Sequence, residues 1–329
     1  VEAAGLKARG DVRLKRDGSL DRLHFSKLEI GDWLDAAVDL TGRGAGRAPA
    51  LSVTSGRLDL RGLGRKDCSG PPGTAPGAAP GGPLTIALDR LTITKGIELT
   101  GFSGQLTREG GGLAGAFAGR VNGQVRVSGS LGPVSEGSVV RIVGDDAGAV
   151  LSAAGVFPNA QGGALEITLK PTGAAGSYDG VLKVAGIRIR KAPALAELIN
   201  AISVVGILDQ MNGSGLLFSE TEAEFRLTPR ALQITRGSAT GGSLGVSVSG
   251  LYVLNGGRLD MQGVISPVYL LNGIGALFTR KGEGLFGFNY KIAGTAKEPV
   301  VSVNPLSILT PGMFREIFRA APPKLEPGE

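Results

Sequence analysis

The composition excludes several classes of protein. The 329 residues include 55 glycines, but they form no collagen-like triplet repeat. The chain also has no sustained low-complexity sequence that would indicate disorder throughout. The net charge is +6, yet basic residues are scattered, with no run beyond Arg188-Ile-Arg-Lys191, and aromatics are only 5%. Such scattering argues against nucleic-acid binding. The single cysteine, Cys68, excludes an internal disulfide framework.

The first half of the chain predicts short antiparallel strands. Asp17-Gly18 and Asn122-Gly123 are two-residue hairpin signals, and turn signals recur about every 8–12 residues. Leu84, Ile86 and Leu88 alternate with Thr, Ala and Asp, which is typical of a strand with one apolar face and one polar face. The Pro/Gly-rich segment 69–83 predicts a disordered loop inserted between strands, because strands resume beyond it.

The second half shows the same alternation of apolar and polar residues. Its apolar positions are Leu165, Ile167, Leu169, Phe225, Leu227, Leu244, Val246 and Val248. Successive side chains of a strand point to opposite faces, so we expect these residues to share one face of the sheet. The result is a mainly β fold: a long, twisted antiparallel sheet that is wet on one side.

An almost uncharged helix is predicted over 193–211. Pro193 suits the first turn, and Gly213 and Gly215 stop the helix. Its apolar stripe contains Leu195, Leu198, Ile199, Ile202, Val205, Ile207 and Leu208. Because so little polar surface remains, we expect the helix at the apolar side of the sheet. A second, short amphipathic helix is predicted over 311–318, followed by a flexible tail over 321–329.

Three motifs with catalytic or cofactor associations have simpler structural explanations. Residues 110–115 fit GxGxxG and residues 241–245 fit GxSxG, but each is followed by a strand pattern where the site needs a helix. Asp145-Asp146 favours a turn or a helix cap and has no patterned co-ligands. His24 has no patterned partner. We therefore predict no catalytic residue, no metal site and no cofactor.

The region from about 135 to 320 resembles the C-terminal part of AsmA-like bacterial envelope proteins. The resemblance is carried by Tyr178-Asp-Gly-Val-Leu-Lys-Val184, a helix ending in Gly206-Ile-Leu-Asp-Gln-Met211, Gly215-Leu-Leu-Phe-Ser-Glu-Thr-Glu-Ala-Glu-Phe225 and Gly256-Gly-Arg-Leu-Asp-Met-Gln-Gly-Val-Ile-Ser-Pro267. Upstream, Gly144-Asp-Asp-Ala-Gly-Ala-Val-Leu-Ser-Ala-Ala-Gly-Val-Phe157 and Gly162-Gly-Ala-Leu-Glu-Ile167 extend it. These motifs are structural, not catalytic.

The resemblance implies one elongated domain over 1–320, curved into an open groove lined by the alternating apolar residues, with the 193–211 helix as a lid. The implied function is non-enzymatic phospholipid transport between inner and outer membranes, as the C-terminal part of a larger periplasmic protein tethered by a preceding segment. Partners would be acyl chains, a membrane surface and envelope proteins. The alternative is a β-rich assembly scaffold with a self-buried apolar face that binds protein partners.

Overall fold

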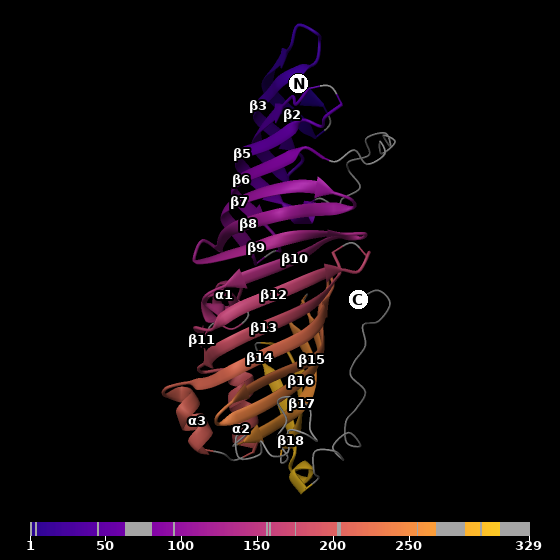
Figure 1. The fold of residues 1–329 in the computed structure, drawn as a ribbon. Coiled ribbons are helices and arrows are strands. Elements are labelled where there is room, and N and C mark those ends of the chain that lie inside the picture. The colour runs from indigo at the N-terminus through magenta and orange to yellow at the C-terminus, as the bar shows by residue number, and fades with distance from the viewer. Residues whose placement is uncertain are drawn as a thin grey trace. The chain divides into compact units, whose positions relative to one another are not determined.

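The chain is mainly β, as the alternation predicts. The computed structural model describes residues 2–3, 5–44, 46–62, 81–94, 96–155, 157, 159–174, 176–202, 205–254, 256–267, 287–296 and 298–309. Strands make up 65% of the structure, and they belong to one open sheet that is not closed into a barrel (Figure 1). The chain divides into two compact units, and a single domain over 1–320 stays a prediction.

Unit 1 comprises residues 1–144 and 153–155. Its elements are β1 (Glu2–Ala3), β2 (Leu6–Leu14), β3 (Leu20–Ile30), β4 (Leu34–Thr41), β5 (Ala50–Asp59), the 3-10 turn η1 (Leu60–Gly62), β6 (Pro83–Thr92), β7 (Glu98–Glu109), β8 (Gly112–Val121), β9 (Val125–Val134) and β10 (Gly137–Gly144). Consecutive strands pair antiparallel, with one exception.

The exception is the pair β5 and β6, which run parallel. The wholly antiparallel sheet that we predicted is therefore wrong at this pair. Parallel neighbours need a crossover long enough to return the chain to the start of the next strand. The connection from Leu60 to Gly82 has that length, although most of it, including residues 69–80 of the predicted loop, lies outside the described residues. Pro83, the last residue assigned to that loop, begins β6.

Both predicted hairpin turns of unit 1 are confirmed. Gly18 has a φ of +78° between β2 and β3, where Ser19 donates its backbone N–H and its hydroxyl to Asp17 Oδ1. Asn122 and Gly123 have φ values of +47° and +75° between β8 and β9. These left-handed conformations explain why Asn and Gly occupy the turn.

Unit 2 comprises residues 145–152 and 156–329. Its elements are α1 (Ala147–Ala153), β11 (Ala160–Gln161), β12 (Ala164–Pro171), β13 (Tyr178–Ile189), α2 (Pro193–Ala201), α3 (Val205–Asn212), β14 (Leu216–Leu227), β15 (Ala231–Gly241), β16 (Leu244–Val253), β17 (Arg258–Pro267), β18 (Phe288–Gly294), β19 (Pro299–Asn304) and the 3-10 turn η3 (Pro305–Leu309). From β12 to β19, each strand pairs antiparallel with the next.

The single helix predicted over 193–211 is wrong, because two shorter helices, α2 and α3, replace it. The first ends at Ala201, with Ile202 as its C-cap. The sequence Ile202-Ser-Val-Val-Gly206 combines β-branched residues, serine and glycine, all of which are poorer helix formers than alanine or leucine. The predicted C-terminal helix over 311–318 lies outside the described residues.

The helix pair packs against both early and late strands of unit 2. Helix α2 contacts β19, and α3 contacts β14 (Figure 1). Ile199 of α2 and Met211 of α3 are fully buried, and so are Leu216, Leu244 and Ile265 at nearby strand ends. The core of unit 2 therefore lies at the end of the sheet that carries these helices. None of the described helices is both long and apolar enough to span a bilayer.

Candidate functional site

One face of unit 1 is apolar across consecutive strands because the register aligns apolar residues. Directly paired residues point to the same face. One row contains Val12, Leu23, Leu40, Leu51, Leu84, Leu106, Gly115, Leu131 and Val140. The next contains Gly10, Phe25, Val38, Val53, Ile86, Gly104, Phe117, Gly129 and Ile142. The rows continue across the parallel β5–β6 pair.

Unit 2 has a matching apolar face of its own. One row contains Leu165, Val184, Thr221, Ala239, Val246, Ile265 and Phe288. A second contains Ile167, Leu182, Ala223, Gly237, Val248, Gly263, Tyr290 and Val303. A third contains Leu169, Gly180, Phe225, Ile234, Gly250, Met261, Ile292 and Val301. Leu227 and Leu244 lie on the same face, near opposite ends of their strands.

The predicted lining residues differ in exposure. Leu88 of unit 1 and Leu165 and Leu244 of unit 2 retain only 4%, 3% and 1% of their surface, so they belong to the cores of their units. The others are half-buried: Leu84, Ile86, Ile167, Leu169, Phe225, Leu227, Val246 and Val248. These half-buried side chains are the part of each apolar face that an apolar ligand can reach.

Aromatic rings lie over glycines on these faces. A Cβ atom on Gly180 would overlap the ring of Phe225 on the paired strand, with Cδ2 only 2.9 Å away. A Cβ atom on Gly129 would overlap both the backbone oxygen of Arg141 and the ring of Phe117, whose Cε1 lies 2.8 Å away. The missing side chain lets each ring lie along the sheet, a pairing that also covers the glycine backbone. The rings therefore add apolar area above the glycines.

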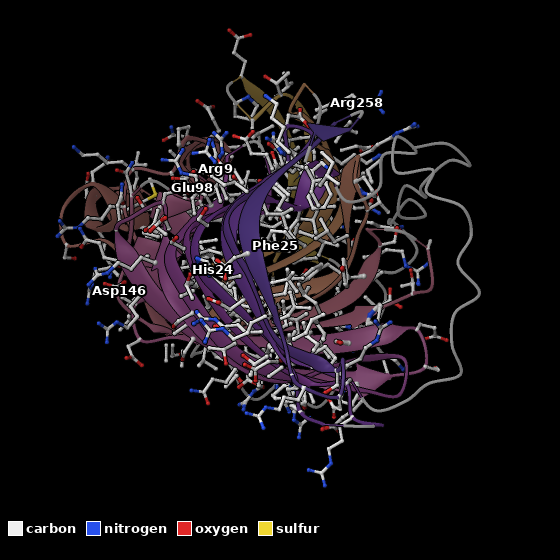
Figure 2. The ribbon with its side chains drawn as sticks, turned by 90° about the horizontal axis from the view of Figure 1, so that it is seen from above. Arg9, His24, Phe25, Glu98, Asp146 and Arg258 are labelled. Atoms are coloured by element: carbon white, nitrogen blue, oxygen red, sulfur yellow. The ribbon has the colours of Figure 1, made fainter. Side chains whose placement is uncertain are left out.

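The opposite face of unit 1 is polar. In β3, Phe25 and His24 point to opposite sides, with Arg9 of β2 on the side of His24 (Figure 2). Asp39 accepts hydrogen bonds from Arg22, at 2.9 Å from Nε and 2.6 Å from Nη2, and lies 2.9 Å from His24 Nδ1. The pKa of the Asp39 carboxyl is below its usual value, mainly because of the hydrogen bond from Arg22 and, to a smaller extent, because of the one from His24. Ion pairs of this kind keep the face hydrated and add little stability.

The polar face of unit 2 carries a comparable pair. Arg226 donates from Nε to Asp179 Oδ1 at 2.8 Å and from Nη2 to Oδ2 at 3.2 Å. The hydrogen bond from Arg226 is the main reason that the pKa of Asp179 is lowered. Arg226 follows Phe225 in β14, so one strand presents an ion pair on one side and an apolar ring on the other.

The motifs with catalytic associations have structural roles. Residues 110–112 connect β7 to β8, and residues 241–244 connect β15 to β16, so neither motif leads into a helix. Ser243 Oγ lies 2.9 Å from Gln210 Oε1 and donates to it. Asp146 Oδ1 accepts the N–H of Ala149 and caps α1, as the cap interpretation predicts. No cluster of potential metal ligands occurs among the described residues.

The predicted lid residues are mostly core residues. Leu198, Ile199, Ile202 and Ile207 are buried, Leu195 and Leu208 are half-buried, and the side chain of Val205 lies outside the description. Sequence reasoning missed α1, although Asp146 followed by an alanine-rich run and Gly155 is a recognisable helix signal. It also missed the glycine–aromatic pairs, which only the register reveals.

No protein-family model, curated protein or solved structure matches the chain. The AsmA-like resemblance therefore stays a prediction, based on the residues that carry it.

Proposed function

We propose that the chain binds phospholipid acyl chains on the apolar faces of its sheet and takes part in lipid transport between bacterial membranes without catalysing a reaction. The observation that carries the proposal is the set of aligned apolar rows, half-buried over much of their length, with ion pairs on the opposite face of β3–β4 and of β13–β14. A groove lined in this way would hold acyl chains while headgroups stay in water.

The energetics suit transfer better than storage. Each methylene removed from water contributes about 0.8 kcal/mol, and contributions are similar along rows of similar aliphatic side chains. The rings of Phe117 and Phe225 occupy the space that side chains would fill at Gly129 and Gly180. An acyl chain that moves from one strand to the next then exchanges one set of apolar contacts for another of comparable strength.

The AsmA-like resemblance supports the cellular part of the proposal. It implies a chain in the periplasm, tethered to the inner membrane, with membrane surfaces and envelope proteins as partners. The α2–α3 pair would then close one end of the lipid-binding face of unit 2, where Leu208 remains half-buried.

The test compares adjacent positions of β6. Ile86→Asp places a charge on the apolar face, whereas Thr85→Asp places it on the opposite, exposed face. We expect the wild-type protein to carry co-extracted phospholipid and to bind a fluorescent fatty acid, Thr85→Asp to retain both properties, and Ile86→Asp to weaken both. Melting temperatures separate loss of binding from loss of folding. Equal binding by both variants would exclude the face as the site.

One observation favours the scaffold alternative: part of the apolar face is already covered within unit 2, where Leu165, Leu244 and Ile265 are buried. A scaffold would bury the remaining rows against a protein partner. It predicts purified protein free of phospholipid, with no binding of the fatty-acid probe.

A further inference from the structure

Two arginines converge on one backbone oxygen at the end of β13. Arg188 Nη1 lies 3.1 Å from the carbonyl oxygen of Ser214, and Arg190 Nε and Nη2 each lie 3.4 Å from the same atom. Three N–H groups thus share one neutral acceptor that has two lone pairs, and two of the contacts are long. The carbonyl positions the guanidinium groups but does not satisfy them.

The arrangement depends on Gly215. A Cβ atom there would lie 2.8 Å from Arg190 Cγ and 2.9 Å from Arg188 Cγ, so both aliphatic stems pass over the glycine. Gly215 is buried and has a φ of +87°. The backbone beside the arginines is also fixed, because Arg190 N–H donates to Asn159 O at 3.1 Å and Asn159 Nδ2 donates to Lys191 O at 3.3 Å.

Neither guanidinium has an ion-pair partner in the part of the chain that the structure describes. Arg22, Arg61 and Arg226, by contrast, each contact a carboxylate. The acid nearest to Arg188 along the facing strand is Glu220, which pairs with Ala185, whereas Arg188 pairs with Leu217. Lys191 adds a third, exposed cation. Among the described residues, the cluster is therefore locally basic and is held in place without a counter-charge.

We propose that Arg188 and Arg190 bind a phosphate group, with Lys191 adding long-range attraction. Planar guanidinium forks match phosphate oxygens in bidentate geometry, and charge-assisted hydrogen bonds of this kind are stronger than bonds to a neutral carbonyl. The ligand is a phosphomonoester or phosphodiester, either free in solution or in a phospholipid headgroup. Only the lipid source rests on the proposed function.

Binding of inorganic phosphate, measured by calorimetry, tests the site without lipid. We expect wild-type protein to bind and Arg188→Gln/Arg190→Gln to bind at least about tenfold more weakly. The matched control is Arg230→Gln/Arg236→Gln, which removes two exposed arginines of unit 2 and should bind as wild type does. Arg188→Lys/Arg190→Lys keeps the charge but loses the fork, and should fall between the two.

Flotation with vesicles distinguishes the two sources of the phosphate group. We expect vesicles of phosphatidylcholine with a minor fraction of phosphatidic acid to retain wild type and the control, but to retain Arg188→Gln/Arg190→Gln less. If inorganic phosphate binds through the arginines and vesicles show no such difference, the site takes a free phosphate compound. Phosphate binding that is absent from wild type, or equal in the folded double variant, overturns the proposal. Fatty-acid binding, tested separately at Ile86, stands or falls independently.

Discussion

Replacing Gly180 with alanine should destabilise unit 2 by displacing the ring of Phe225. The three atoms nearest to the new Cβ all belong to the ring of Phe225, so the ring must move to make room. The cost is that of an overpacked site, about 1–3 kcal/mol in the free energy of unfolding. Because Phe225→Leu removes the obstruction, the double variant should lose less stability than the two single variants together, with a coupling of about 0.5–3 kcal/mol.

Equilibrium urea unfolding of the four proteins measures this coupling, with the dependence on urea checked for two-state behaviour. Gly132→Ala is the control, since no atom lies within 4 Å of a Cβ there, and it should change stability by less than about 0.5 kcal/mol. Additive single effects would refute the reasoning, as would a Gly180→Ala protein as stable as wild type.

Three other predictions follow from buried or paired side chains. Ile199→Ala should cost about 2–5 kcal/mol of unfolding free energy because Ile199 is fully buried in α2, and a neutral result in urea would show that the helix does not belong to the core. Asp146→Ala should lower stability by about 0.5–2 kcal/mol through loss of the α1 cap, and an unchanged melting temperature would contradict that role. The Asp39 pKa is lowered in the folded state, so its stabilising contribution is present above the unfolded pKa of about 3.9 and is lost as pH falls through the folded pKa. Urea midpoints of wild type and Asp39→Asn should therefore converge as pH falls below about 4, and a pH-independent difference would rule out this linkage.

The two faces of each strand could be predicted because apolar and polar residues alternate along the sequence with a period of two. Leu84 to Leu88 and Leu244 to Val248 alternate in the sequence, and side-chain direction follows from that alternation alone. The parallel pairing of β5 with β6 could not be predicted, because a strand shows the same alternation in parallel and antiparallel pairs. The long segment between them was the available signal.

Other features depend on contacts between residues far apart in the chain. The apolar periodicity continues through Ile202 and Val205, so it predicts one helix. It does not reveal the weak helix propensity at the boundary between α2 and α3. The sequence presents Arg188 and Arg190 as ordinary residues of a polar face. Their convergence requires the turn at Ser214-Gly215, which follows a helix and lies beside β13 only in the folded chain.

The central claim, that acyl chains lie on the apolar faces, is tested most directly by photocrosslinking within cells. A benzophenone side chain would replace Ile86 or Phe225 on an apolar face, and Ala87 or Glu224, their exposed neighbours on the opposite face, in matched proteins. Mass spectrometry of the purified protein after irradiation would detect attached phospholipid. We expect phospholipid adducts at Ile86 and Phe225 and few at Ala87 and Glu224. Equal adducts on both faces, or none at either apolar position in folded protein, would contradict the claim.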